Sequence, residues 1–288
     1  MADTLTDFLF PAYGVRGAVV EITTGIGEML GSRVYAPDVR KIVGQAIAAM
    51  PLLASHSKFE GRINLQFQEG KGAIKLLVAQ IDRHLVVRGM AKAAEDAQGT
   101  FEELVQGGTL AMMLDPDVGT QNYQAFVPTE GAALANALET YFMQSEQLPT
   151  MMRLAMSEGR LAGILLQRLP EGVADEQGWE HLQALLGTLD EAELASVDAE
   201  TLMRRLFHAE ELSMFEPRAV KLSCRCDRGS IATMLLGLGE EELTPVLEER
   251  GKVDVTCEFC GHEYIFTPIE VKELFSAALG EPLTPTRH

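Results

Sequence analysis

The chain has 288 residues, of which 47% are hydrophobic, and a formal net charge of -18. This length and composition predict a globular protein with one large domain and one small domain. The excess of acidic residues argues against nucleic acid as a partner, because phosphate binding requires clustered Lys and Arg side chains.

The sequence also indicates a location. No apolar run approaches the length of a membrane span, so we expect no membrane-embedded segment. The N-terminus, Met1 to Asp7, lacks the basic start and apolar stretch of a secretion signal, and we expect a cytoplasmic protein. Cytoplasmic thiols are kept reduced, so clustered cysteines there favour metal binding or redox chemistry over permanent disulfides.

The first elements in chain order are a strand, a helix and a meander. Val15–Ile22 is typical of a strand, and Pro37–Ser55 predicts an amphipathic helix with Pro51 near its end. Three alternating segments then predict strands, with a hairpin at Gly70–Gly72: Arg62–Gln68, Ala73–Gln80 and His84–Arg88.

Two glycine pairs, Gly25-x-Gly27 and Gly70-x-Gly72, are interpreted as turns. Neither continues into the third glycine or the Gly-Lys-Ser/Thr ending that a phosphate-binding loop requires. We therefore expect no ATP site.

The next segments complete a first domain over residues 1–170. They predict a short helix after Thr100, strands at Thr109–Leu114 and Tyr123–Val127, a helix over Gly131–Ser145, and a hairpin of Thr150–Met156 with Leu161–Leu169. The fold class we expect is α+β, with mainly antiparallel sheets and packed helices.

Residues 171–216 differ in character from what precedes them. They contain twelve acidic residues and two basic ones, Arg204 and Arg205. Apolar residues nevertheless recur at helical spacing: Trp179, Leu182, Leu185, Leu186, Leu189, Leu194, Leu202, Leu206 and Phe207. We expect an acidic helical linker of two or three amphipathic helices that lie on another part of the protein.

Residues 217–288 predict a small C-terminal domain. Its expected elements are helices at Ser230–Leu236, Glu240–Gly251 and Pro268–Leu279, and strands at Lys252–Thr256 and up to Phe266. A core of this size supplies about 3–5 kcal/mol, whereas a structural zinc contributes about 10–16 kcal/mol. Loss of a metal would unfold such a domain.

All four cysteines lie in this C-terminal domain, in the pairs Cys224-x-Cys226 and Cys257-x-x-Cys260. Two short loops that each present two thiolates are the usual way to build a tetrahedral site, and zinc is its default occupant. Gly261 allows a turn in which backbone amides point at sulfur. We expect Cys224, Cys226, Cys257 and Cys260 to be metal ligands.

The spacing alone leaves several uses of these thiols open. A disulfide between Cys224 and Cys226 would close a small, strained ring, and strained disulfides are easily reduced and regulatory. A structural zinc ribbon, a redox-responsive site and an iron-sulfur or catalytic site are the alternatives.

Enzymatic alternatives have weaker support. A thiol-disulfide oxidoreductase would place Cys257 at the start of a helix within a βαβ unit, but the pair lies between predicted strands. His208-x-Glu210 resembles part of a zinc deaminase motif, yet Thr256 stands where that motif has proline. We interpret His208 as a helix-surface residue and His262 as a strand residue, and we expect no enzyme.

Several segments together resemble the redox-regulated 33 kDa heat-shock chaperonin family. They are Val15–Gly17, Tyr141–Thr150, Gly163–Pro170, Leu206–Glu211 and the two cysteine pairs, with Tyr264 and Phe266 after the second pair. The resemblance extends over nearly the whole chain.

The resemblance implies an ATP-independent chaperone (holdase) that binds unfolding proteins under oxidative stress. In such a protein, Cys224, Cys226, Cys257 and Cys260 bind zinc when reduced and form Cys224–Cys226 and Cys257–Cys260 disulfides when oxidised. Oxidation then releases zinc, unfolds the C-terminal domain and linker, and leads to homodimers that hold client proteins. We expect the linker to cover apolar surface of residues 1–170 until the metal is lost.

Overall fold

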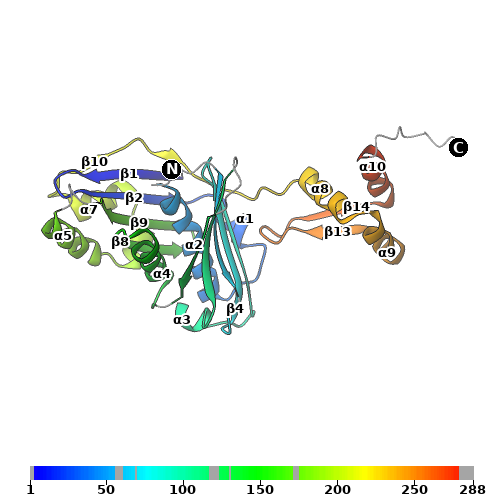
Figure 1. The fold of residues 1–288 in the computed structure, drawn as a ribbon, viewed down its shortest axis with the longest axis horizontal. Coiled ribbons are helices and arrows are strands. Elements are labelled where there is room, and N and C mark those ends of the chain that lie inside the picture. The colour runs from blue at the N-terminus through cyan, green and yellow to red at the C-terminus, as the bar shows by residue number, and fades with distance from the viewer. Residues whose placement is uncertain are drawn as a thin grey trace. The chain divides into compact units, whose positions relative to one another are not determined.

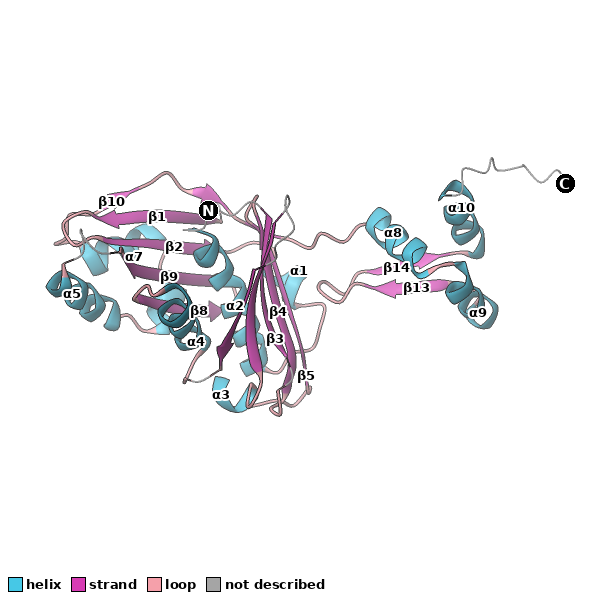
Figure 2. Cartoon of the chain, in the orientation of Figure 1, coloured by secondary structure: helices cyan, strands magenta, loops and turns pink. Residues whose placement is uncertain are grey.

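The structure is a computed structural model that describes residues 3–55, 61–68, 70–116, 123–129, 131–170 and 175–278 (Figure 1). The chain forms two compact units, Met1–Ser223 and Cys224–His288. Helices and mainly antiparallel sheets are mixed along the chain (Figure 2), which confirms the predicted α+β class. No helix in the described ranges has both the length and the apolar character to span a bilayer.

Among the described residues, six antiparallel strands form a first sheet in the first unit. In spatial order they are β10 (Ser213–Met214) and β11 (Arg218–Ala219), which both pair with β1 (Thr4–Phe10), then β2 (Val15–Ile22), β9 (Arg160–Arg168) and β8 (Thr150–Ser157). The predicted strand at Val15–Ile22 is confirmed. β1 is not among the predicted strands, because its residues do not alternate regularly between polar and apolar.

A second sheet in the first unit also has six strands within the described ranges. Its order is β12 (Lys221–Leu222), β5 (Val86–Ala93), β4 (Ile74–Asp82), β3 (Gly61–Gln68), β6 (Thr109–Pro116) and β7 (Tyr123–Pro128). The pairs are antiparallel except that of β12 with β5. This arrangement confirms the predicted meander.

Helix α2 (Pro37–Ser55) packs against both sheets of the first unit. Its contacts reach β4 and β5 in the second sheet and β2, β8 and β9 in the first. Because both sheets contact it, the helix is buried around most of its circumference, and Ile42, Val43, Ile47 and Met50 are among its buried apolar residues. Pro51 is accommodated inside the helix, which continues to Ser55.

Two of the short helices in the first unit begin at defined caps. Helix α1 (Ile26–Leu30) begins at Gly25, whose φ of 75° favours glycine, so the Gly25-x-Gly27 pair marks a helix start. Helix α3 (Phe101–Leu104) begins with a capping box between Thr100 and Glu103.

The predicted helix over residues 131–145 is shorter and ends differently. Helix α4 (Leu134–Tyr141) continues into a π-helical turn, η1 (Phe142–Glu146). The start is delayed because Gly131 has a φ of 121° and Ala133 is extended. Gln147 ends the turn with a φ of 55°, a left-handed conformation that non-glycine residues seldom adopt.

The acidic linker forms three helices in its described part. They are α5 (Glu176–Gly187), α6 (Glu191–Ser196) and α7 (Ala199–Phe207). Asp175, Asp190 and Asp198 each cap one helix by accepting a hydrogen bond from a backbone amide. Some of the acidic residues of this segment are therefore helix caps rather than only a solvated face.

The second unit contains α8 (Arg228–Leu238), α9 (Glu240–Arg250), β13 (Val253–Thr256), β14 (Glu263–Phe266) and α10 (Pro268–Ala278). β13 and β14 pair antiparallel. Its buried apolar cluster consists of Leu235, Leu243, Val253, Phe266 and Val271 among the residues that are described. Residues Arg218–Leu222 pair with strands of the first unit. The boundaries at residues 170 and 216 remain predictions.

Candidate functional site

The two cysteine loops of the second unit are each shaped by short-range hydrogen bonds. Cys224 and Cys226 precede helix α8, where Asp227 accepts a hydrogen bond of 2.8 Å from the Ser230 amide and so fixes the end of the first loop. Cys257 and Cys260 lie in the turn between β13 and β14.

The second loop is a tight turn that requires glycine. The Gly261 amide donates to the Cys257 carbonyl (2.8 Å), and the Cys257 amide donates to the His262 carbonyl (2.9 Å). Gly261 has a φ of 69°, so the turn uses a conformation that favours glycine. The His262 amide, rather than that of Gly261, donates to the sulfur of Cys260.

The four sulfur atoms of Cys224, Cys226, Cys257 and Cys260 lie within 4.8 Å of one another. The Sγ–Sγ distances are 3.6 Å from Cys224 to Cys257 and 3.3 Å from Cys226 to Cys260. Zinc–sulfur bonds of about 2.3 Å in a tetrahedron place sulfurs roughly 3.8 Å apart. The four thiols could therefore hold a metal ion, and the described part of the chain brings together no other such group of His, Cys, Asp or Glu side chains.

The proton affinities of the thiols differ strongly within this cluster. Burial raises the pKa of Cys224, but hydrogen bonds from the amide and thiol of Cys226 and from the other thiols outweigh it and lower that pKa to about 7. Burial raises the pKa of Cys226 and of Cys260. Cys224 thus ionises more readily than Cys226 and Cys260, and a bound cation would favour the ionised form of these thiols.

Aromatic and charged side chains surround the loops. The Tyr264 hydroxyl is hydrogen-bonded to Cys226, and this bond is the main cause of the raised pKa of Tyr264. The His262 ring lies against Tyr264, with 4.6 Å between ring centroids. His262 precedes β14 rather than lying in it. The motif names Tyr264, but its bond to sulfur is visible only in the structure.

Arg228 connects the helical and strand parts of the second unit. Its guanidinium lies 4.2 Å from the centroid of the Phe266 ring and pairs with Glu270 at 2.6 Å. This residue is absent from the sequence-based expectations, because no motif pairs it with residues about 40 positions away.

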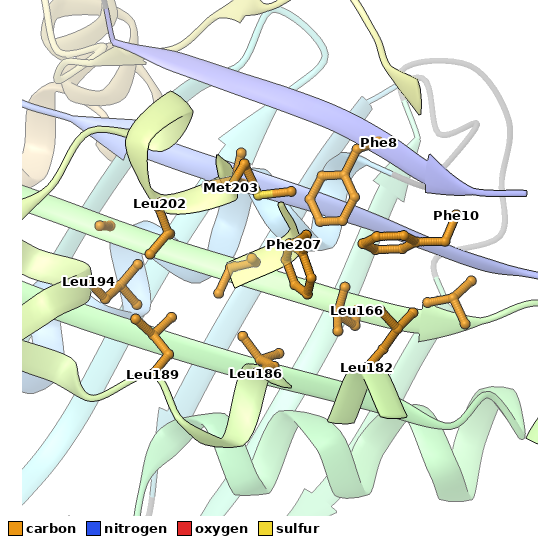
Figure 3. Packing of buried hydrophobic residues seen from close by; sticks show 14 of the residues in the cluster. Phe8, Phe10, Leu166, Leu182, Leu186, Leu189, Leu194, Leu202, Met203 and Phe207 are labelled. Carbon is orange, nitrogen blue, oxygen red and sulfur yellow. The ribbon is translucent and has the colours of Figure 1, made fainter. Parts of the chain in front are cut away.

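A second candidate feature is the apolar face of the first sheet, which the linker helices cover (Figure 3). The sheet contributes Phe8, Phe10, Val15, Val19, Ala155, Ala162, Ile164 and Leu166. The linker contributes Trp179, Leu182, Leu186, Leu189, Leu194, Leu202, Met203 and Phe207. We call these residues together the covered cluster. The ring of Phe207 lies 5.0 Å from that of Phe10 and 6.4 Å from that of Phe8, measured between centroids.

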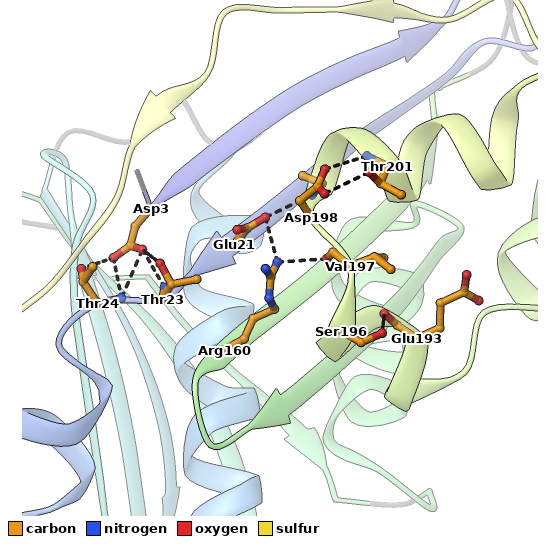
Figure 4. A network of polar contacts seen from close by, with 11 residues as sticks. Asp3, Glu21, Thr23, Thr24, Arg160, Glu193, Ser196, Val197, Asp198 and Thr201 are labelled. Carbon is orange, nitrogen blue, oxygen red and sulfur yellow. Dashed lines mark hydrogen bonds and ion pairs between the residues drawn. The ribbon is translucent and has the colours of Figure 1, made fainter. Parts of the chain in front are cut away.

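A buried polar contact fixes the junction between α6 and α7 on the first sheet (Figure 4). Glu21 pairs with Arg160 at 2.9 Å and accepts a hydrogen bond of 3.1 Å from the Ala199 amide. Arg160 also donates to the Val197 carbonyl at 2.9 Å. The side chains of Glu21 and Arg160 are only 7% and 15% exposed, so each depends on the other for its neutralisation.

The end of the linker has a second polar contact, around Glu210. The Tyr13 hydroxyl donates to Glu210 at 2.6 Å, and a ring nitrogen of His181 lies 2.9 Å from the other carboxylate oxygen. The hydrogen bond from Tyr13 is the main cause that lowers the pKa of Glu210, followed by that from His181. His208 lies at the end of α7 and is exposed, as interpreted from the sequence.

Comparison with known proteins identifies the family. Residues 3–267 match the family described as Hsp33 protein. The chain belongs to the Hsp33 family. This Hsp33-family protein is 37% identical over 287 residues to the 33 kDa chaperonin of Nitrosococcus oceani, with 99% of each chain covered. It is 38% identical over 279 residues to that of Neisseria meningitidis serogroup B, with 95% of this chain and 92% of the relative covered.

A solved Hsp33 structure has the same fold. The crystal structure of the 33 kDa chaperonin from Thermotoga maritima superposes with a TM-score of 0.81 at 21% identity, covering 96% of this chain and 99% of that one. Membership of the Hsp33 family, from the family match and the relatives, makes this chain a molecular chaperone rather than an enzyme and confirms the predicted family. The antiparallel setting of Cys257 and Cys260 differs from the helix start that an oxidoreductase motif needs.

Proposed function

We propose that this chaperone is a redox-regulated, ATP-independent holdase, inactive while reduced and active after oxidation. In the reduced state Cys224, Cys226, Cys257 and Cys260 would hold one zinc ion. The observation that carries this proposal is the convergence of four sulfurs from two loops within 4.8 Å. An all-sulfur donor set at these distances favours zinc among the common metals of the cytoplasm, where we place the protein.

The bound ion would keep the sulfurs ionised and connect the two loops. Few buried apolar residues support the second unit, whose described cluster has five. A structural zinc contributes about 10–16 kcal/mol to such a small domain. The folding of residues 217–288 would therefore depend on the four sulfur ligands.

Oxidation removes these ligands. A peroxide or hypochlorous acid takes two electrons from each pair of thiols; with peroxide, a disulfide and two molecules of water result. We propose the pairs Cys224–Cys226 and Cys257–Cys260. Disulfides within each loop leave the two loops unconnected, whereas disulfides across the short contacts of 3.6 and 3.3 Å would keep them tied together.

The covered cluster supplies the apolar surface for clients. We propose that unfolding of the C-terminal domain, residues 217–288, loosens the linker, residues 171–216, from the domain of residues 1–170. The linker contributes eight of the buried residues in this cluster. Its release would therefore expose apolar faces both on the linker and on the first sheet. Unfolding proteins would bind there, and the same surface supports homodimers of the oxidised protein.

The deciding experiment counts released zinc and free thiols before and after peroxide treatment with mild warming, in parallel with an aggregation assay. We expect one zinc per chain to be lost together with four thiols, and aggregation of a thermally unfolding client to be suppressed only afterwards. Peptide mapping should find disulfides within each loop. Turnover of an insulin-type disulfide substrate without suppression of aggregation would instead support an oxidoreductase.

Hydrogen exchange tests the role of the linker. Amides of α5, α6 and α7 should exchange slowly in the reduced protein and rapidly in the oxidised one, while α2 stays protected in both. Equal protection of residues 175–216 in the two states would contradict linker release.

A further inference from the structure

The first unit contains a cavity of about 210 Å³ that neither the thiols nor the linker helices use. Its walls come from the end of α2, from β3 and β6 of the second sheet, and from η1, and include the apolar side chains of Leu52, Ile63, Met112 and Leu114. An apolar cavity of about 150 Å³ accommodates a benzene ring. This cavity therefore has room for one large apolar side chain.

Polar groups with complementary hydrogen-bonding roles line the same cavity. The Nε and Nη2 atoms of Arg16 both donate to the Gln167 side-chain oxygen, at 3.0 and 2.5 Å. A guanidinium has five N–H groups, so Arg16 keeps donors for another acceptor. Glu146 accepts from the Tyr141 hydroxyl at 3.0 Å, and its carboxylate has further acceptor capacity.

A donor and an acceptor beside an apolar cavity match the chemistry of one residue in an unfolded polypeptide. Such a residue presents an apolar side chain flanked by a peptide carbonyl and a peptide N–H, both without partners in the chain. Arg16 is suited to the carbonyl and Glu146 to the N–H. A purely apolar ligand would leave the remaining hydrogen-bonding capacity of both groups unused.

The backbone at this cavity is irregular. Tyr141 begins the transition from α4 into the π-helical turn η1, and Gln147 follows it with a φ of 55°. Such π-helical turns and left-handed non-glycine residues are common at functional sites. Segments far apart in the chain also meet here, since Arg16 comes from β2, Glu146 from η1 and Gln167 from β9.

We propose that this cavity binds one apolar side chain of an unfolded client polypeptide, with Arg16 donating to the peptide carbonyl and Glu146 accepting from the peptide N–H. This client site rests on the proposed holdase function and adds to it a specific pocket in the first unit. A single pocket binds weakly, so several such contacts along a client would act together.

The test uses N-acetyl-phenylalanine amide as the probe and follows the methyl resonances of Met112 and Leu114 in the full-length protein. We expect saturable shifts with the probe. Leu114→Phe, which fills the cavity from a half-buried position in β6, should weaken probe binding at least fivefold. Met113→Phe is the matched control, because adjacent residues of a strand point to opposite faces and Met113 does not line this cavity.

Two further arms keep the test decisive. Arg16→Met should weaken binding of the probe and leave binding of toluene unchanged, whereas equal effects on both would overturn the role of the polar groups. Leu148→Phe fills the cavity from a different wall and replaces Leu114→Phe if that variant fails to fold.

The aggregation assay separates this site from the general function. If oxidised wild-type protein suppresses aggregation and the cavity-filling variant does so equally well, the pocket is not a client site although the holdase function stands. If oxidised wild-type protein fails to suppress aggregation, the holdase function itself is wrong. If the cavity-filling variants still bind the probe as the wild type does, the proposal that the probe binds in this cavity is wrong, whatever the aggregation assay shows.

Discussion

At the scale of single residues, the site depends on a few side chains whose neighbours change their chemistry. Cys224 ionises near neutral pH while burial raises the pKa of Cys226 and Cys260. The Tyr264 hydroxyl is hydrogen-bonded to one of these sulfurs. The pKa of Cys224 therefore depends on the other three thiols of the cluster.

Substitution of one ligand should disable the proposed metal site. Cys257→Ser removes a thiolate and leaves three ligands, and we expect zinc affinity to fall by more than the factor of about 10–100 that loss of a supporting neighbour causes. Hydrogen exchange in α8–α10 should become fast, and the protein should be active without oxidant. Zinc content and exchange rates measure this.

Thr256→Ser is the control for that substitution. It changes the exposed neighbour of Cys257 and removes no sulfur. A Cys257→Ser protein that binds one zinc, keeps a compact second unit and remains inactive would contradict the proposal.

Glu210 should make linker docking sensitive to acid. Hydrogen bonds from Tyr13 and His181 lower the pKa of Glu210 in the folded protein. In the unfolded chain a Glu side chain has a pKa of about 4.3. The contribution of Glu210 to the free energy of unfolding is therefore complete above that pH and is lost as the pH falls through the lower pKa of the folded state. The chain has one tryptophan, Trp179, which is buried in the covered cluster. Its emission should shift to longer wavelength in acid.

Glu210→Gln should flatten this dependence on pH. The amide cannot ionise, so the part of the acid-induced loss that belongs to Glu210 disappears. Glu211→Gln, at an exposed neighbouring position, is the matched control. Identical pH profiles for both variants and the wild type would show that Glu210 has no such role.

At the scale of elements, the linker helices are held by apolar burial, by backbone hydrogen bonds to the buried Glu21–Arg160 pair of the first sheet, and by the contacts of Glu210. Helix α7 is short, with nine residues, and isolated helices of that length are unstable in water. Its structure therefore depends on the first sheet. The same holds for α6, which has six residues.

Phe207→Ala should loosen the linker without any oxidation. Phe207 is 2% exposed and contacts the rings of both Phe8 and Phe10, so truncation leaves a cavity and costs about 3–5 kcal/mol. We expect a red-shifted Trp179 emission and chaperone activity in the reduced protein. Arg204→Ala, at an exposed position of the same helix, is the control. A reduced Phe207→Ala protein as inactive as the wild type would refute linker docking as the inhibitory contact.

At the scale of the whole molecule, the two units differ in what supports their folds. The first unit has α2 buried between contacts to two sheets, and it also contains the covered cluster. The second unit has a small apolar cluster and the four thiols. Stability is thus distributed unequally, and the unit that contains the thiols is the weaker one.

Removal of the metal should destabilise the second unit and leave the first unit folded. Treatment of the reduced protein with a strong chelator should unfold α8–α10, because about 10–16 kcal/mol of binding free energy is lost, while α2 and the central strands stay protected. Hydrogen exchange measured unit by unit checks this outcome. Protection of α8–α10 that survives chelation would show that the second unit folds without metal.

The sequence by itself determined most elements of this fold and the ligand set of the proposed site. Helix α2 and the meander follow from hydrophobic periodicity, which is a local property of the chain. The cysteine pairs follow from spacing, because each short loop restricts where its two sulfurs can lie. The π-helical turn at Phe142–Glu146 and strand β1 lack such a local signal, since long-range pairing and packing decide them.

Only the tertiary structure decided which surfaces meet. Helical periodicity showed that the linker has an apolar face, but only the tertiary structure showed that this face packs on β1, β2, β8 and β9. The contacts of Glu21 with Arg160 and of Tyr13 with Glu210 join residues 139 and 197 positions apart, respectively. Side-chain contacts at such separations depend on how the whole chain packs, and no local pattern encodes them.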